Sequence, residues 1–136
     1  MSETRHEASC GCGALRVTAL GAPGRTMLCS CISCQKRTGT ALGVSAYWPE
    51  EQTHVSGAST IWRRSGQQGR SFEHHFCPVC GTTVWWRGDF APGMIGIAGG
   101  AFEDSNFLKP TKAYWAASRP AWLAGIFDIE TLERQG

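Results

Sequence analysis

The sequence predicts a mainly β domain built from short antiparallel strands. The 136 residues include 17 glycines, the runs of β-branched and aromatic residues are short, and turn-forming residues separate them. The apolar residues show no long amphipathic helix. A chain of this length is enough for one domain with a modest core, so we expect residues 1–136 to form a single unit that bound metal would help to stabilise.

Two runs in the first half of the chain have the composition of strands. Residues 14–19 alternate well enough for a strand, and a Gly-Ala-Pro-Gly turn at residues 21–24 ends it. Residues 41–48 are apolar and rich in β-formers, and Pro49 ends this second run. Both runs are therefore expected to be strands.

Residues beyond 58 predict a hairpin and two further strands. Residues 59–64 and 71–76 have strand composition and are separated by a glycine-containing loop. Residues 82–87 and 94–98 predict two more strands with a turn between them. Weaker signals predict short elements at residues 113–117 and 122–126, and a last helical turn at residues 130–135.

Three thiols occur within six residues, at Cys29, Cys31 and Cys34. Ser30 is expected to cap a short helical turn ended by Gly39, which puts Cys31 and Cys34 on one face, with Cys29 reaching in from an extended segment. Three sulfurs can share a tetrahedral metal ion and leave its fourth corner for a substrate. Alternatively, these cysteines are buried small side chains or part of a structural site completed from elsewhere.

The other four thiols occur as two tight pairs. Cys10 and Cys12 alternate with glycines that let the backbone fold tightly. Cys77 and Cys80 belong to the run Cys-Pro-Val-Cys-Gly, in which proline fixes one φ angle and glycine permits the positive φ that often follows. This second motif is typical of a zinc knuckle.

Seven cysteines divide into a closed zinc site with four ligands and an open site with three. The division that we favour has a structural ion held by Cys10, Cys12, Cys77 and Cys80, and a second ion held by Cys29, Cys31 and Cys34. In a rival division, one four-thiol site takes its ligands from Cys31, Cys34, Cys77 and Cys80. The spacing leaves both divisions open.

The charge balance and the polar N-terminus limit the partners that we expect. The 13 basic and 11 acidic side chains give no basic surplus that argues for nucleic acid. Residues 1–8 lack the apolar run of a signal peptide, and no segment has the length to span a bilayer. We therefore expect a reducing, cytoplasmic setting, where clustered cysteines bind metal more often than they form disulfides.

The order of these motifs resembles the glutathione-dependent formaldehyde-activating enzyme family, also known by its CENP-V/GFA domain. The resemblance rests on C-x-C-G at residues 10–13, C-x-C-x-x-C followed by basic residues and Thr-Gly at 29–39, F-C-x-x-C-G at 76–81, and an aromatic region at 114–122. Many members have histidine where this chain has Ser30.

The resemblance implies a zinc-knotted, mostly β fold of the Mss4-like or β-tent kind. By position it implies structural zinc ligands at Cys10, Cys12, Cys77 and Cys80, and ligands of a catalytic zinc at Cys29, Cys31 and Cys34. The reaction that it implies is condensation of glutathione with formaldehyde to S-hydroxymethylglutathione, which is classed as a carbon–sulfur lyase reaction. The expected partners are thus a small thiol such as glutathione and an aldehyde.

Few other residues predict a role in binding or catalysis. Lys36 and Arg37 are expected to attract the carboxylates of glutathione. No clear general base is visible, because the neighbouring His74 and His75 point to opposite faces of a strand and are expected mainly at the surface or in the core. Of the six tryptophans, most are expected in the core, and at least one of the adjacent pair at 85 and 86 is expected to line a pocket or an interface.

Three other functions remain open from the sequence. In the first, both zinc sites only hold the fold of a non-catalytic binding or scaffold module. In the second, Cys31 and Cys34 act as the C-x-x-C of a thiol–disulfide oxidoreductase, although the third thiol at Cys29 favours metal. A nucleic-acid-binding zinc ribbon is the third, and the charge balance argues against it.

Overall fold

A computed structural model describes residues 4–66, 69–123, 125 and 129–135. Strands dominate these parts of the chain, which confirms the predicted mainly β class. The strands are β1 (Arg5–Ser9), β2 (Arg16–Leu20), β3 (Arg25–Cys29), β4 (Gly43–Pro49), β5 (Thr53–Ser56), β6 (Thr60–Ser65), β7 (Ser71–Phe76), β8 (Thr83–Gly88), β9 (Met94–Ala98), β10 (Lys112–Tyr114) and β11 (Glu130–Thr131). Helix α1 spans Ile32–Thr38, and short 3₁₀ helices span Glu50–Gln52, Gly99–Ala101, Ala116–Ser118 and Ala121–Leu123.

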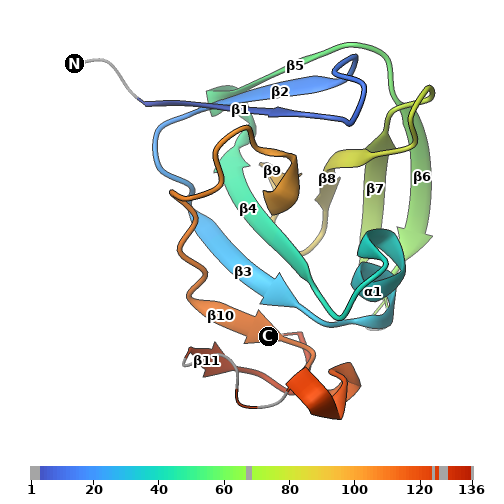
Figure 1. The fold of residues 1–136 in the computed structure, drawn as a ribbon, viewed down its shortest axis with the longest axis vertical. Helices are drawn as coiled ribbons and strands as arrows, with labels where there is room; N and C mark the ends of the chain where they lie inside the picture. Colours follow the sequence, from blue (N-terminus) through green and yellow to red (C-terminus); the bar gives the residue numbers. More distant parts are fainter. Residues whose placement is uncertain (1–3, 67–68, 124, 126–128, 136) are drawn as a thin grey trace.

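The strands form two sheets. The smaller sheet has the order β1-β2-β5 and is antiparallel throughout. The larger has the order β11-β10-β3-β4-β9-β8-β7-β6, and it is parallel only where β10 pairs with β3 and with β11. Figure 1 shows the smaller sheet crossing one end of the molecule, with β10 and β11 at the opposite end.

Cross-strand pairing assigns the side chains of the larger sheet to its two faces. One transverse row runs through Tyr47, Gly96, Trp86, His74 and Trp62, each directly opposite the next. Directly opposed residues project from the same face, and their sequence neighbours project from the other. This row therefore defines one face, which carries the cavity described below.

The other face of the larger sheet packs against the smaller sheet and forms the main core. Its matching row runs through Ala46, Ile97, Trp85 and His75. The fully buried Leu15 and Val17 lie in the same apolar cluster as Trp48 and Trp85. Each buried aliphatic side chain of this size stabilises the fold by about 1.5–3 kcal/mol relative to exposure. The two adjacent tryptophans thus point to opposite faces, as predicted.

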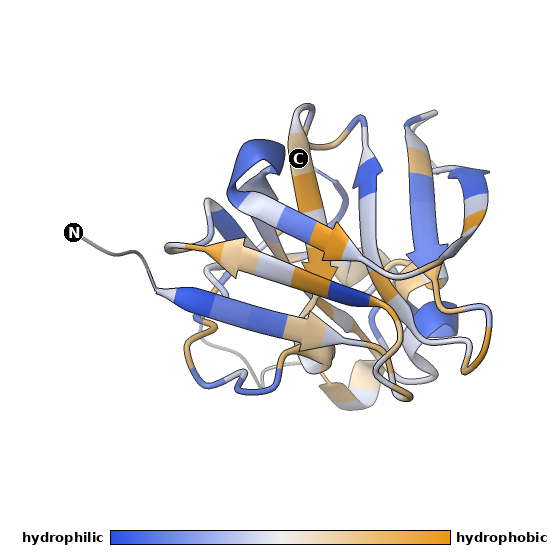
Figure 2. Ribbon diagram, turned by 90° about the horizontal axis from the view of Figure 1, so that it is seen from above, coloured by the Kyte–Doolittle hydropathy of each residue, from blue (hydrophilic) through white to orange (hydrophobic). Residues whose placement is uncertain are grey.

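The expected strands after residue 13 are present, and their ends move by a few residues. The structure also contains strands that the sequence pattern did not indicate, β1 and β5. Strand β1 gave no apolar signal because its first residues are hydrophilic, as Figure 2 shows, and only Ala8 of this strand is buried. Strand β5 alternates half-buried and exposed side chains over four residues.

The helical turn predicted at residues 130–135 is wrong. Glu130 and Thr131 form β11, which pairs in parallel with β10, and the Leu132 amide donates to the Ala113 carbonyl over 2.8 Å. Hydrogen bonds to an available sheet edge outweigh a weak local helix signal. Of the element predicted at 122–126, residues 124 and 126 lie outside the described residues. No helix in the described ranges has both the length and the apolar character needed to cross a membrane.

Candidate metal centres

The first group of thiols joins two hairpin turns from different sheets. The sulfurs of Cys10, Cys12, Cys77 and Cys80 all lie within 4.8 Å of one another. The Sγ of Cys12 is 3.7 Å from that of Cys10 and 3.7 Å from that of Cys77. A tetrahedral zinc ion with bonds of about 2.3 Å places its sulfurs about 3.8 Å apart. The spacing of this group, called the closed group below, therefore suits a zinc ion.

Backbone amides around the closed group point at its sulfurs. The Leu15 amide donates to Cys10 Sγ over 3.3 Å, and the Val79 amide donates to Cys77 Sγ over 3.4 Å. Hydrogen bonds from the Thr82 hydroxyl and amide lower the pKa of Cys80 to about 5. Such donors stabilise thiolates, the form that binds metal.

The second group consists of the three thiols around the start of α1. The sulfurs of Cys29, Cys31 and Cys34 lie within 4.8 Å of one another, and no fourth His, Cys, Asp or Glu from the described residues joins them. Their mutual hydrogen bonds lower the pKa of Cys31 and raise that of Cys29. This set, the open group below, has the donors for a metal ion with one position left over. None of the seven cysteines forms a disulfide.

The cap of α1 is Cys31 and not Ser30 as predicted. The Cys31 sulfur accepts a hydrogen bond from the Cys34 amide over 3.3 Å. Ser30 is still extended, because its amide donates to the Tyr114 carbonyl and continues the ladder between β3 and β10. Gly39 ends the helix with a φ of 71°, as predicted. The capping sulfur is thereby fixed beside the other two thiols.

A cavity of about 450 Å³ opens beside the open group. All three thiols line it, together with aromatic side chains from several strands of the larger sheet and from the segment after β10. A volume of this size is typical of sites for small molecules. The two groups of sulfurs follow the favoured division, and the ligand set of the rival division is not brought together. A substrate in this cavity would have access to the position that the open group leaves over.

Residues 5–118 match the family model described as glutathione-dependent formaldehyde-activating enzyme. The chain belongs to this family. The match includes both thiol groups, helix α1 and most of both sheets. A crystal structure of a Rhodobacter sphaeroides protein shares the fold, with a TM-score of 0.54 and 21% identity over 71% of this chain and 87% of that chain. No curated protein matches the chain.

Both predicted basic residues of this GFA-family chain line the cavity. Lys36 is exposed, whereas Arg37 is partly buried and its guanidinium lies 4.6 Å from the centroid of the Trp86 ring. The Nη2 atom of Arg37 is buried without a hydrogen-bond partner. A Cβ at Gly43 would lie 2.5 Å from this Nη2, so glycine leaves the space that the guanidinium occupies.

Three further residues of the GFA-family cavity were not indicated as partners by the sequence. Arg64 Nε donates to His74 Nε2 over 3.1 Å. Burial, together with the charges of Arg64 and Arg37, lowers the pKa of His74 to about 4, so the imidazole is neutral at pH 7. Tyr47 is buried in the cavity wall, and its hydroxyl accepts a hydrogen bond from Trp86 Nε1 over 2.9 Å. The alternation in residues 71–76 predicted opposite faces for the two histidines but not which one faces the thiols.

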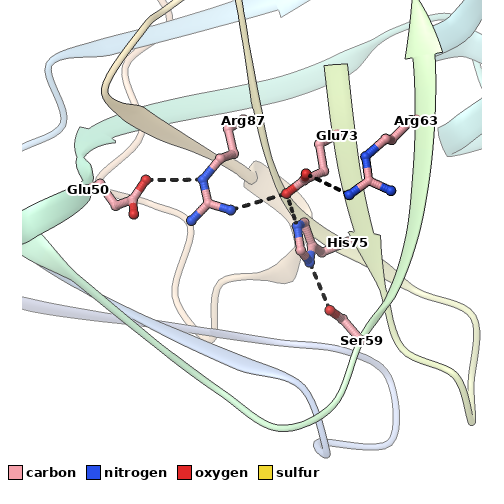
Figure 3. A network of polar contacts seen from close by, with 6 residues as sticks. All are labelled: Glu50, Ser59, Arg63, Glu73, His75 and Arg87. Atoms are coloured by element: carbon pink, nitrogen blue, oxygen red, sulfur yellow. Dashed lines mark hydrogen bonds and ion pairs between the residues drawn. The ribbon is translucent and has the colours of Figure 1, made fainter. Parts of the chain in front are cut away.

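A polar network on the opposite face of the sheet contains the other histidine (Figure 3). His75 lies 2.8 Å from Ser59 Oγ through Nδ1 and 2.7 Å from Glu73 through Nε2. Glu73 also pairs with Arg63 and Arg87, and hydrogen bonds from His75 and Arg87 lower the pKa of its carboxyl.

This order of serine, histidine and glutamate resembles a catalytic triad, but the packing argues against that role. The His75 ring is stacked on Trp85 with centroids 3.6 Å apart. Neither Ser59 nor His75 lines a described cavity. The serine and the histidine are therefore not presented to a ligand, and the network links β6, β7 and β8.

Proposed function

We propose that this protein is a zinc-dependent enzyme that forms or cleaves the carbon–sulfur bond between a small thiol such as glutathione and an aldehyde such as formaldehyde. The observation that carries the proposal is the open group, whose three sulfurs face a cavity of about 450 Å³ with no fourth described ligand. Membership of the GFA family supports this chemistry. In this proposal, Cys29, Cys31 and Cys34 hold a catalytic zinc, and Cys10, Cys12, Cys77 and Cys80 hold a structural one.

The reaction is a balanced addition. The thiol sulfur bonds to the aldehyde carbon, the second bond of the carbonyl group breaks, and the thiol proton ends on the oxygen. When bound by the open group, zinc supplies a free coordination position and lowers the pKa of a thiol that occupies it. The cavity walls bring the two reactants together so that they react as one molecule.

In this proposal, Tyr47 donates a hydrogen bond to the oxygen as negative charge develops on it. Its own oxygen accepts from Trp86 Nε1, which leaves the O–H proton free to donate into the cavity. Burial raises the pKa of Tyr47 to about 12, so the phenol keeps its proton at neutral pH. Lys36 and Arg37 line the cavity, and in this proposal they attract the carboxylates of the thiol.

Cys31→Ser tests the catalytic assignment. Serine retains an oxygen that can cap α1, so the variant should keep its helix while losing one ligand of the open group. Purified, zinc-loaded variant should lose formation of S-hydroxymethylglutathione and keep about one zinc per chain where the parent holds two. The measurements are NMR detection of the adduct and metal analysis. Unchanged turnover would overturn the assignment and favour a scaffold module.

A further inference from the structure

The cavity beside the open group is basic. Four basic residues line it, and none of its described lining residues is acidic; the basic ones are Lys36, Arg37, Arg64 and Arg70. These four side chains favour ligands of the opposite sign, and a zinc ion held by the open group would offset the negative charge of its thiolates. The cavity is therefore suited to an anion.

Arg37 is held in this wall by an aromatic ring and not by a carboxylate. Its guanidinium packs over Trp86, and it forms no ion pair with a described residue. Its Nη2 is buried against Gly43, so the rest of the guanidinium is the part that can meet a ligand in the cavity. A Cβ built on Gly43 would lie 2.5 Å from this Nη2 and 3.5 Å from the Cys34 Cβ, which places the guanidinium beside the open group.

Arg64 reaches the same cavity from the edge strand β6. Its guanidinium packs 4.3 Å from the centroid of the Phe72 ring, and its Nε donates to neutral His74. No described carboxylate offsets its charge. Arg37 packs over Trp86 and Arg64 donates to His74, and these two rings are neighbours in the transverse row with centroids 5.7 Å apart. Two guanidinium groups are thus presented side by side to one ligand.

We propose that the cavity selects thiols by their carboxylates alone, with Arg37 and Arg64 as the carboxylate partners and without recognition of an ammonium group. This inference rests on the proposed function and narrows its substrate class to anionic thiols. Glutathione qualifies through its two carboxylates. Its ammonium group, however, meets no acidic side chain among the described residues of the cavity.

A ligand series on the unmodified protein tests the proposal. S-methylglutathione, its N-acetyl derivative and its dimethyl ester are titrated against the tryptophan fluorescence of the protein, because Trp62 and Trp86 line the cavity. The N-acetyl derivative should bind at least as tightly as S-methylglutathione. The ester should bind about tenfold more weakly or worse, because it loses charge-assisted hydrogen bonds. The same order is expected with and without zinc.

Variants identify the two partners. Arg37→Gln and Arg64→Gln should each weaken binding of the free acid about tenfold and leave binding of the ester almost unchanged. Arg63→Gln is the matched control, because Arg63 is the neighbour of Arg64, points to the other face and pairs with Glu73. Binding by the Arg63 variant should equal that of the parent.

Two results would overturn the inference. One is an ester that binds the parent as tightly as the free acid, and the other is an N-acetyl derivative that binds about tenfold more weakly than S-methylglutathione. Failure of the proposed function has a different signature. In that case the ligand series ranks as expected, but the parent makes no adduct from glutathione and formaldehyde.

Discussion

Tyr47 occupies a position that only the folded sheet explains. It lies on β4, which pairs with β3 on one side and β9 on the other, and its side chain is buried in the cavity wall. Trp86 Nε1 donates a hydrogen bond to its hydroxyl oxygen. Gly96 lies opposite both Tyr47 and Trp86. A Cβ at Gly96 would collide with the two rings, so glycine permits this hydrogen bond.

Tyr47→Phe should lower kcat about 100-fold and change KM little, because the lost hydroxyl donates only to the developing oxyanion. Steady-state kinetics on zinc-loaded protein measures this, with metal analysis to show that both sites are filled. Tyr114→Phe is the control, since Tyr114 is also buried but does not line the cavity. Equal losses in the two variants would rule out a direct role for Tyr47.

At the scale of residues, the sequence predicted thiol groups better than their surroundings. The cysteines could be grouped because ligand number and tight spacing restrict how seven sulfurs divide. Arg64 and Tyr47 could not be found in this way. They are 17 positions apart and meet the thiols only through the register of strands that are not consecutive in sequence.

Among the elements, α1 depends most on its contact with β4. Gly43 pairs with Cys29 at the end of β3, and its missing side chain leaves room for the Arg37 guanidinium. The Gln35 side chain joins the helix to the Ser30 and Ser118 carbonyls over 2.8 and 2.9 Å. The helix is therefore fixed on both sides, although it is only seven residues long.

Gly43→Ala should displace Arg37 and weaken binding of S-methylglutathione by about the same factor as removal of its charge, roughly tenfold. The zinc content of the zinc-loaded variant should equal that of the parent, since no thiol changes. Gly100→Ala is the matched control, because a Cβ there meets no atom within 4 Å. Fluorescence titration and metal analysis check both variants. Parental affinity in Gly43→Ala would show that Arg37 is not held as described.

Strand prediction succeeded where buried β-forming residues cluster and failed where an element depended on its neighbours. Strands β8 and β9 carry several buried residues each and were predicted from residues 82–87 and 94–98. Strand β11 has only two residues, both exposed, and is held by hydrogen bonds to β10. No local pattern distinguishes such a strand from a turn.

For the whole molecule, a metal ion bound by the closed group would act as a cross-link between the two sheets. Its turns follow β1 in the smaller sheet and β7 in the larger one, and Cys12 and Cys77 are 65 positions apart. Closing a loop of this length by a covalent cross-link stabilises a fold by about 4 kcal/mol. Metal coordination applies the same constraint, and its binding energy adds to folding.

Cys12→Ser should lower Tm by about 10 °C or more, because the exposed Cys12 contributes coordination and little packing. Cys34→Ser should lower Tm by less than half as much, since a metal ion held by the open group would close only a short loop. Differential scanning calorimetry of zinc-loaded proteins makes the comparison. Equal losses of Tm would mean that the closed group does not carry the extra stability.

That residues 1–136 form one domain in a cytoplasmic setting stays a prediction.

The parallel pairing of β10 with β3 has a consequence for the order in which the protein is made. Cys29 lies opposite Tyr114, which leaves the ribosome 85 residues later. Until that strand arrives, β3 has an unpaired edge, and the nascent thiols lack part of their aromatic wall. The surroundings of these three thiols are therefore completed only when most of the chain has been synthesised.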